Sequence, residues 1–271
     1  MTVMSSEYAL PGDKYSSEAY YSDELKAIHK RSWWIIGHAS EWEKAGDFKR
    51  FRIFGENIVV IRDRDGRLHG MANICQHRGA EICTADGGNT GKVLRCPYHG
   101  WSYRLDGSVL GVPSRDTFES DPKERRLPVV RVDTAMGFVW INLDPECDPL
   151  SCHLDLLFAM RFGDGPNPLD QYSIETLGLA RKVDYGSVRA NWKLLWENFS
   201  ECYHCPALHN SLCDAVPQFA AGYGTVTGPQ GQGAELAENY EGFSASRART
   251  GRVLPGLPDD QHRMFYGALL W

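Results

Sequence analysis

The sequence has 271 residues, of which 42% are hydrophobic and 24% are charged, and its net charge is −6. This composition is ordinary for a soluble globular protein with one large domain or two modest ones. The acidic balance argues against nucleic acid as a partner, and no apolar run approaches the roughly 18 residues of a membrane span. Eight cysteines without an apolar secretory signal at the N-terminus indicate a reducing compartment, for which the cytoplasm is the expectation.

The first predicted element is a helix over residues 22–34, with Ser22 as its N-cap. Its apolar stripe comprises Leu25, Ile28 and Trp33. We assign residues 1–38 to an N-terminal helical segment on this basis.

Short strands separated by turn residues follow from about 47 to 143. The sequence predicts turns at 55–57, at Asp65–Gly66 and at Asp106–Gly107, and a further strand at 137–143. Short strands joined by tight turns are typical of an antiparallel sheet. We therefore expect a small antiparallel β domain over residues 39–155.

After residue 155 the pattern changes. A Pro/Gly-rich segment at 163–170 predicts a linker, and residues 178–190 predict a strand. A helix is then expected from Asn191, its N-cap, through His204. The apolar side of that helix carries Trp192, Leu195, Trp196, Phe199 and Tyr203.

Beyond Pro206 the sequence predicts long polar loops and then a strand at 265–271, in which the chain stops. We expect residues 171–271 to form an incomplete second domain.

Two cysteines and two histidines form a C-x-H pair, Cys75 and His77, and a C-x-x-H pair, Cys96 and His99. Both pairs fall in loops between predicted strands. A structural zinc site also uses two Cys and two His, but it usually groups Cys with Cys and His with His. In a Rieske [2Fe–2S] centre one iron takes two thiolates and the other takes two imidazoles, so mixed pairs on two loops favour that centre over zinc. Cys83 has no partner in the second loop and is expected to be a buried thiol.

A second group comprises Glu201, His204 and His209. Two imidazoles and a carboxylate form the facial triad of non-haem Fe(II) oxygenases. Glu201 and His204 share a helical face, whereas His204 and His209 are five residues apart, so Pro206 must bend or unwind the helix between them. Alone, the trio equally fits a surface helix with two ordinary histidines.

Together the two motifs resemble the α subunit of Rieske non-haem iron ring-hydroxylating oxygenases, over nearly the whole chain. The resemblance implies an α+β fold, with a small antiparallel β Rieske domain and the N-terminal part of a helix-grip-like α+β catalytic domain. The signature from Glu197 to His209 implies that His204 and His209 ligate a mononuclear Fe(II). It also implies that Glu201 is the carboxylate that links this iron to a Rieske histidine of the neighbouring subunit. Asp is commoner there, and Glu followed by Cys-Tyr-His-Cys is more similar to oxygenases of quaternary ammonium compounds such as glycine betaine or carnitine.

By this resemblance the protein is an oxidoreductase that uses O₂ to hydroxylate a small organic substrate. The reaction is either N-demethylation of a quaternary ammonium compound or aromatic-ring hydroxylation. No G-x-G-x-x-G motif is present, so NAD(P)H is expected to act only through a separate flavin/iron–sulfur reductase, with or without a ferredoxin. A homo-trimer is the implied assembly. The alternative is a Rieske-type electron-transfer protein without oxygenase chemistry, which needs only the first motif.

The family's third iron ligand is an Asp far downstream of the two histidines. The contexts of Asp214, Asp259 and Asp260 do not match it. We therefore expect that ligand beyond residue 271, and a fragment that is inactive on its own.

Overall fold

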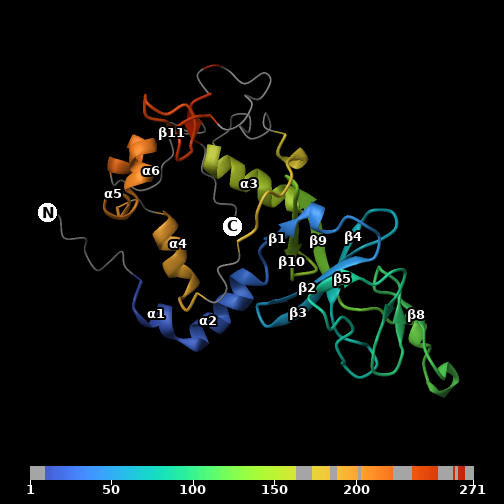
Figure 1. Ribbon diagram of the computed structural model, residues 1–271. Helices are drawn as coiled ribbons and strands as arrows, with labels where there is room; N and C mark the ends of the chain where they lie inside the picture. The colour runs from blue at the N-terminus through green and yellow to red at the C-terminus, as the bar shows by residue number, and fades with distance from the viewer. Residues whose placement is uncertain are drawn as a thin grey trace. The chain divides into compact units, whose positions relative to one another are not determined.

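The computed structural model describes residues 10–162, 173–183, 188–200, 203–221, 234–249, 259 and 262–265. The chain divides into two compact units, shown in Figure 1. The β unit comprises Ser22–Leu150 together with Glu175–Arg181. The helical unit holds the described residues of Met1–Tyr21, Ser151–Ile174 and Lys182–Leu270.

The β unit is built from antiparallel strands, as predicted. Its strands are β1 (Trp34–His38), β2 (Asp47–Ile53), β3 (Glu56–Arg62), β4 (Leu68–Ala72), β5 (Gly87–Asn89), β6 (Leu94–Arg95), β7 (Ser102–Tyr103), β8 (Val109–Gly111), β9 (Val129–Ala135) and β10 (Phe138–Asn142). Among the described residues, seven of them form one sheet in the order β1-β10-β9-β4-β3-β2-β5, and β6-β7-β8 form a second. The predicted hairpins at Asp65–Gly66 and Asp106–Gly107 and the strand predicted at 137–143 are confirmed.

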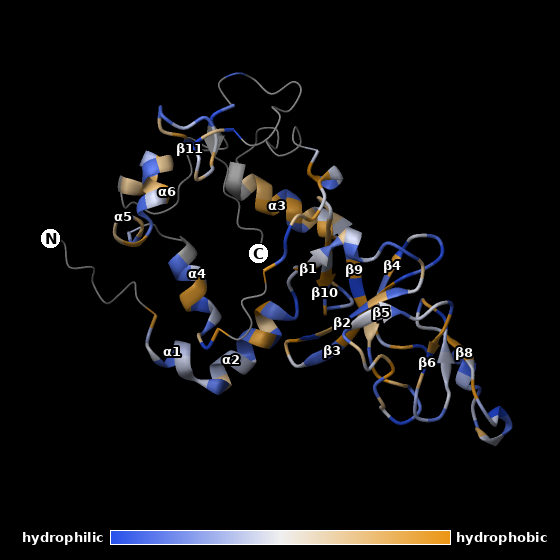
Figure 2. Ribbon diagram, in the orientation of Figure 1, coloured by the Kyte–Doolittle hydropathy of each residue, from blue (hydrophilic) through white to orange (hydrophobic). Residues whose placement is uncertain are grey.

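Strand β3 is buried on both faces and holds the sheet between two hydrophobic clusters. Val59 and Ile61 pack into the cluster that contains Met71 and the cysteines of the predicted site. Ile58 and Val60 point to the opposite face and join the second cluster. Each fully buried aliphatic side chain contributes about 1.5–3 kcal/mol, so this strand fixes the register of its neighbours. In Figure 2 β10 is likewise coloured as hydrophobic, which agrees with its buried pattern.

The turn between β2 and β3 differs from the prediction at 55–57. Ile53 pairs with Glu56, so the two turn residues are Phe54 and Gly55, both with positive φ (53° and 80°). A bulky residue is strained in this conformation, where Asn or Gly is usual. The Phe54 ring compensates by stacking on His29 at a centroid distance of 5.0 Å and by packing against Trp34.

The turn between β3 and β4 is stabilised by Asp63. Its carboxylate accepts hydrogen bonds from the Asp65 and Arg67 amides and lies 2.7 Å from His69 Nε2. Burial raises the pKa of Asp63, but the bonds from His69 and the two amides outweigh it, so the net pKa is lowered. This stabilisation is therefore present above the unfolded-state pKa and is lost as the pH falls through the lower folded-state value.

Replacing Asp63 with Asn should lower the free energy of unfolding by about 1–3 kcal/mol at neutral pH, because hydrogen bonds to a charged acceptor are lost. Urea unfolding at several pH values measures the effect. The wild type and Asp63→Asn should converge in stability as the pH falls below 4 or so. A difference that stays constant down to the acid limit would contradict the assignment.

The N-terminal helix is displaced from its predicted position. The structure has α1 (Asp13–Ser16), α2 (Glu18–Glu24) and a π-helix at Leu25–His29. Ser22 lies inside α2 and is not an N-cap, and Trp34 begins β1. The prediction failed because Trp34 pairs with Ile141 of β10, a contact distant in sequence that outweighs the local helical pattern.

The helical unit has the elements α3 (Leu150–Phe162), α4 (Trp192–Ser200), α5 (Cys205–Leu208), α6 (Asn210–Ala215), a 3₁₀ turn at Pro217–Ala221, β11 (Ala234–Glu235) and β12 (Met264–Phe265). The sequence did not predict α3. The strand predicted at 178–190 was wrong for 178–183 and 188–190, which are irregular. The linker at 163–170 and the end of the chain beyond Phe265 lie outside the described residues. The region beyond Pro206, predicted as loop, is helical at α5 and α6.

Helix α4 begins as predicted, since the Asn191 side chain accepts a hydrogen bond from the Lys193 amide at 3.0 Å. The N-terminal segment contacts this helix. Tyr15 donates to Glu197 at 2.5 Å, and the Asn191 side chain donates to the Tyr15 carbonyl at 3.0 Å. On the predicted apolar side of α4, Leu195 and Trp196 are 39% and 46% exposed.

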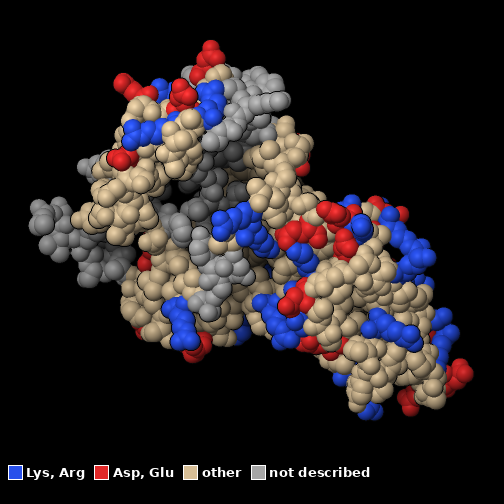
Figure 3. Space-filling model, in the orientation of Figure 1, with Lys and Arg blue, Asp and Glu red and all other residues tan. Residues whose placement is uncertain are grey.

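No helix among the described residues has the length and apolar character needed to cross a bilayer. On the face of the molecule shown in Figure 3, acidic and basic side chains are interspersed, and neither sign forms a wide field.

Candidate functional site

Two loops of the β unit have the same backbone form. In the loop after β4, the Cys75 amide donates to the Ala80 carbonyl and the Gly79 amide donates to the Cys75 carbonyl. In the loop between β6 and β7, the Cys96 amide likewise donates to the Trp101 carbonyl, and the Gly100 amide donates to the Cys96 carbonyl. The two glycines have φ of 74° and 73°, which a side chain would strain. The shared C-x-x-x-G spacing is a signal for matched loops that the sequence reasoning missed.

The two loops bring the four predicted donors together. His77 Nδ1 and His99 Nδ1 lie 3.1 Å apart, so both imidazoles present the same ring nitrogen to one region. Burial raises the pKa of the Cys75 thiol; the nearby Cys96 adds to this rise, and the Tyr103 hydroxyl opposes it. The donors thus sort into a thiol pair and an imidazole pair. Across the described residues, these four included, no group of three or more His, Cys, Asp or Glu side chains surrounds a position for one metal ion.

This donor set fits a binuclear cluster, because such a cluster takes thiols at one iron and imidazoles at the other. The thiols are buried, and a bound metal favours the thiolate form against the effect of burial. Burial, His99, Arg78 and Arg125 all lower the pKa of His77. The neutral imidazole that metal binding requires is therefore the favoured form.

Aromatic side chains cover the His77 ring. Trp101 stacks on it with a centroid distance of 5.3 Å and an interplanar angle of 2°. Phe118 packs edge-on against Trp101 at 5.6 Å. Arg125 lies over the Trp101 ring and donates to the Gln76 carbonyl at 3.2 Å. These contacts fix the orientation of His77.

Tyr103 is a site residue that the sequence reasoning missed. Its hydroxyl oxygen accepts from the Gln76 amide at 3.0 Å and lies 3.1 Å from Cys75 Sγ. Burial raises the pKa of Tyr103, so the hydroxyl keeps its proton. A metal-bound thiolate has no proton to donate, so in the occupied site the hydroxyl would donate to the Cys75 sulfur. Its position four residues after His99, in a buried strand, was the available signal.

Replacing Tyr103 with Phe should lower the reduction potential of the cluster by about 40 mV, which corresponds to about 1 kcal/mol in a one-electron couple. The reason is that a hydrogen bond to sulfur stabilises the more negative, reduced state. Potentiometric titration followed by electron paramagnetic resonance measures the shift. Tyr98→Phe is the matched control, since Tyr98 lies in the loop between Cys96 and His99 and is 62% exposed, and phenylalanine keeps its ring contact with His99. Equal potentials for Tyr103→Phe and the wild type would contradict the assignment.

The second candidate group lies in the helical unit. Helix α5 begins after His204 and ends before His209, with Pro206 in its first turn. The two imidazole rings lie 5.2 Å apart at an interplanar angle of 77°. The predicted helix through His204 was wrong at its end, because Tyr203 and His204 form a turn and a new helix begins at Cys205. Pro206 lies in the first turn of that helix, where its missing N–H costs nothing.

The predicted carboxylate of this group, Glu201, lies outside the described residues. Among the residues that are described, no third His, Cys, Asp or Glu completes a three-donor group with the pair. His204 and His209 therefore supply two converging imidazoles, which fit part of a facial triad.

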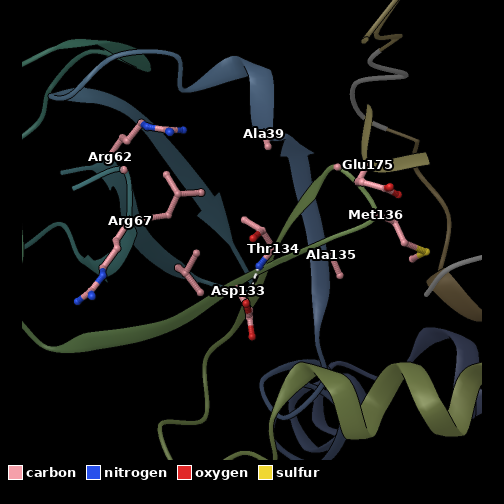
Figure 4. A pocket seen from close by; sticks show the side chains of 12 residues that line it. Ala39, Arg62, Arg67, Asp133, Thr134, Ala135, Met136 and Glu175 are labelled. Carbon is pink, nitrogen blue, oxygen red and sulfur yellow. Dashed lines mark hydrogen bonds between the residues drawn. The ribbon is translucent and has the colours of Figure 1, made fainter. Parts of the chain in front are cut away.

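A cavity of about 680 Å³ lies elsewhere on the β unit. Figure 4 shows Arg62 and Arg67 on one side and Asp133 to Met136 on the other. It lies at the Leu68 end of β4, whereas Cys75 follows the Ala72 end. None of the predicted site residues lines it.

Comparisons with known proteins match both parts of the chain. The model of the Rieske [2Fe–2S] domain matches residues 32–130, and that of the ring hydroxylating alpha subunit (catalytic domain) matches residues 169–271. The carnitine monooxygenase oxygenase subunit of Acinetobacter pittii is 35% identical over 212 residues, which cover 77% of this chain and 54% of that protein. The biphenyl 2,3-dioxygenase subunit alpha of Rhodococcus jostii is 34% identical over 194 residues, covering 70% of this chain and 41% of that protein.

Among solved structures, the quaternary ammonium Rieske monooxygenase CntA superposes with a TM-score of 0.67 at 33% identity, covering 77% of this chain and 56% of that one. The chain thus belongs to the α-subunit family of Rieske ring-hydroxylating oxygenases. It carries the Rieske [2Fe–2S] domain and an α+β part of the catalytic domain, which implies a cluster and a mononuclear iron as cofactors. It spans about half the length of the curated relatives that it matches.

Proposed function

We propose that this chain is part of an oxygenase subunit that passes electrons from a separate reductase to a mononuclear iron, where O₂ is used to hydroxylate a small organic substrate. The observation that carries the proposal is that one chain brings together two sets of donors. In the first set, the Nδ1 atoms of His77 and His99 lie 3.1 Å apart. In the second set, the ring centres of His204 and His209 lie 5.2 Å apart. An electron carrier needs the first set alone.

In this proposal Cys75, His77, Cys96 and His99 hold the [2Fe–2S] cluster, and His204 and His209 hold the iron. The cluster supplies one-electron transfer when bound, and the iron supplies O₂ activation. The protein keeps His77 neutral and oriented, and it buries both thiols away from water. The proposed domain boundaries are 1–38, 39–155 and 171–271.

The proposed role of Glu201 is to link the two centres between subunits. A carboxylate that accepts a hydrogen bond from the ring N–H of a metal-bound histidine is a common contact around metal sites. Such a contact to a Rieske histidine of the neighbouring subunit requires a homo-oligomer, which we propose to be a trimer. The electron donor is proposed to be a flavin/iron–sulfur reductase, with NAD(P)H as the primary reductant.

The proposed substrate is a quaternary ammonium compound. Two observations support it: the Glu201-Cys-Tyr-His-Cys sequence, and the likeness to a carnitine monooxygenase subunit and to CntA. One oxygen atom of O₂ enters a C–H bond next to nitrogen. The other leaves as water, with two electrons from NADH and two protons. The hydroxylated carbon then separates from the amine as a carbonyl compound.

The test uses the full-length subunit with a supplied reductase. NADH oxidation and O₂ uptake are measured with trimethylammonium carboxylates and with aromatic acids. The expected result is uptake that depends on a trimethylammonium substrate, with an amine and a carbonyl product. If the cluster is reduced but neither class of compound stimulates O₂ uptake, the protein is an electron carrier instead.

A further inference from the structure

A cavity of about 900 Å³ lies beside His209 in the helical unit. One wall is α6, with Asp214 toward its end, and the other is the loop from Tyr240 to Arg247. The cavity therefore has a predicted iron ligand at its edge, a carboxylate on one wall and a guanidinium on the other. Phe243 adds an aromatic surface.

The loop that carries Arg247 is tightly folded. Glu241 and Gly242 both donate their amides to the Arg247 carbonyl, at 2.8 and 3.2 Å, and the Arg247 amide donates to Ser244 at 2.9 Å. A Cβ on Gly242 would lie 2.9 Å from the Ala248 carbonyl oxygen, so the loop closes only around glycine. The backbone of Arg247 is thus held through both of its polar groups.

Arg247 is held in an unfavourable conformation. Its φ is 62°, the left-handed region that residues with a Cβ rarely adopt. In this conformation its guanidinium lies 5.0 Å from the centre of the Tyr240 ring. Tyr240 is itself buried in the cluster with Ala215 and Val216, so the ring is a fixed support. Strain retained at a cavity wall is a feature of binding sites.

We infer that Arg247 binds the carboxylate of the substrate in the cavity beside His209. The substrate is then a zwitterion, with its ammonium group toward Asp214 and Phe243 and its carboxylate on Arg247. A guanidinium binds a carboxylate through paired hydrogen bonds, and aromatic faces and carboxylates attract ammonium groups. This inference rests on the proposed function, and it names the carboxylate as the group recognised.

The test is calorimetric binding of three compounds to the full-length subunit at constant salt. They are 4-(trimethylammonio)butanoate, its methyl ester, which keeps the ammonium but lacks the carboxylate charge, and benzoate. Arg247→Gln should weaken binding of the butanoate by about 10- to 100-fold, the loss expected for a charge-assisted hydrogen-bond pair, and leave binding of the ester unchanged. Arg249→Gln is the matched control, because Arg249 lies two residues beyond Arg247, is exposed and does not line the cavity. It should change neither.

Arg247→Gly keeps the inference testable if the glutamine variant folds poorly, because glycine adopts positive φ without strain. It should unfold at no lower temperature than the wild type and show the same loss of carboxylate binding. Unchanged affinity of both Arg247 variants for the butanoate, or an equal loss for the ester, would overturn the inference. Arg247-dependent binding of benzoate alone would support the role of Arg247 and refute the proposed quaternary ammonium substrate.

Discussion

Replacing Cys75 with Ser is expected to remove the [2Fe–2S] cluster. The purified variant should lose its red-brown colour, and its acid-labile sulfide should fall to near zero. The reason is that the soft thiolate is the ligand that iron–sulfur clusters select, and a serine hydroxyl does not replace it. Visible absorption with iron and sulfide analysis measures the effect.

Cys83 provides the matched control for this experiment. It is buried in the same hydrophobic cluster as Cys75, and burial raises its pKa to about 11. Cys83→Ser should reduce stability, because it buries a hydroxyl, yet retain colour and sulfide. Equal loss of the cluster from both variants would mean that the fold and not the ligand had been lost. Stoichiometric zinc without sulfide in the wild type would refute the Rieske assignment.

Replacing His204 with Ala is expected to abolish turnover, by at least about 10³-fold, while leaving the cluster in place. One of the two converging imidazoles is removed, and a metal that activates O₂ contributes several kcal/mol to the rate. The full-length subunit should lose the iron that exceeds one iron per acid-labile sulfide, which is the iron outside the cluster. The visible spectrum of the cluster should not change, since its proposed ligands lie in the β unit.

His262 is a suitable control for this variant, because it belongs to the helical unit and pairs with Asp259 at 3.6 Å. His262→Ala should keep both the excess iron and turnover. Retention of both in His204→Ala would show that another residue ligates the iron. Loss of the cluster in His204→Ala would show that the substitution acts through folding.

The parts that the sequence predicted correctly depend on local patterns. The strands around the Cys/His loops were predicted from short segments separated by turns such as Asp106–Gly107, which need no distant contact. The four proposed Rieske donors remain a prediction, which rests on the same kind of local pattern, since each Cys/His pair lies within one short loop. The N-cap at Asn191 was equally local.

The errors involve contacts between distant residues. The β2–β3 turn uses Phe54 where Asn is usual, and the strain is compensated by His29, which is 25 residues earlier in the chain. The hydrogen bond of Tyr103 to Cys75 joins residues 28 positions apart. The position of Arg247 depends on a left-handed backbone conformation that its residue type disfavours. The sequence did not predict helix α3. The apolar residues of this helix do not form one buried stripe, since Leu156 is 62% exposed.

The two ends of the Cys/His site meet different surroundings, because its thiols are buried and His99 is open to solvent. Charge added at the imidazole end is met by mobile water, whereas charge added at the thiol end is met by protein dipoles that reorient little. With the proposed cluster bound, dielectric relaxation would therefore favour an added electron at the imidazole end. The proposed reductase would also make its shortest approach to the cluster at that end.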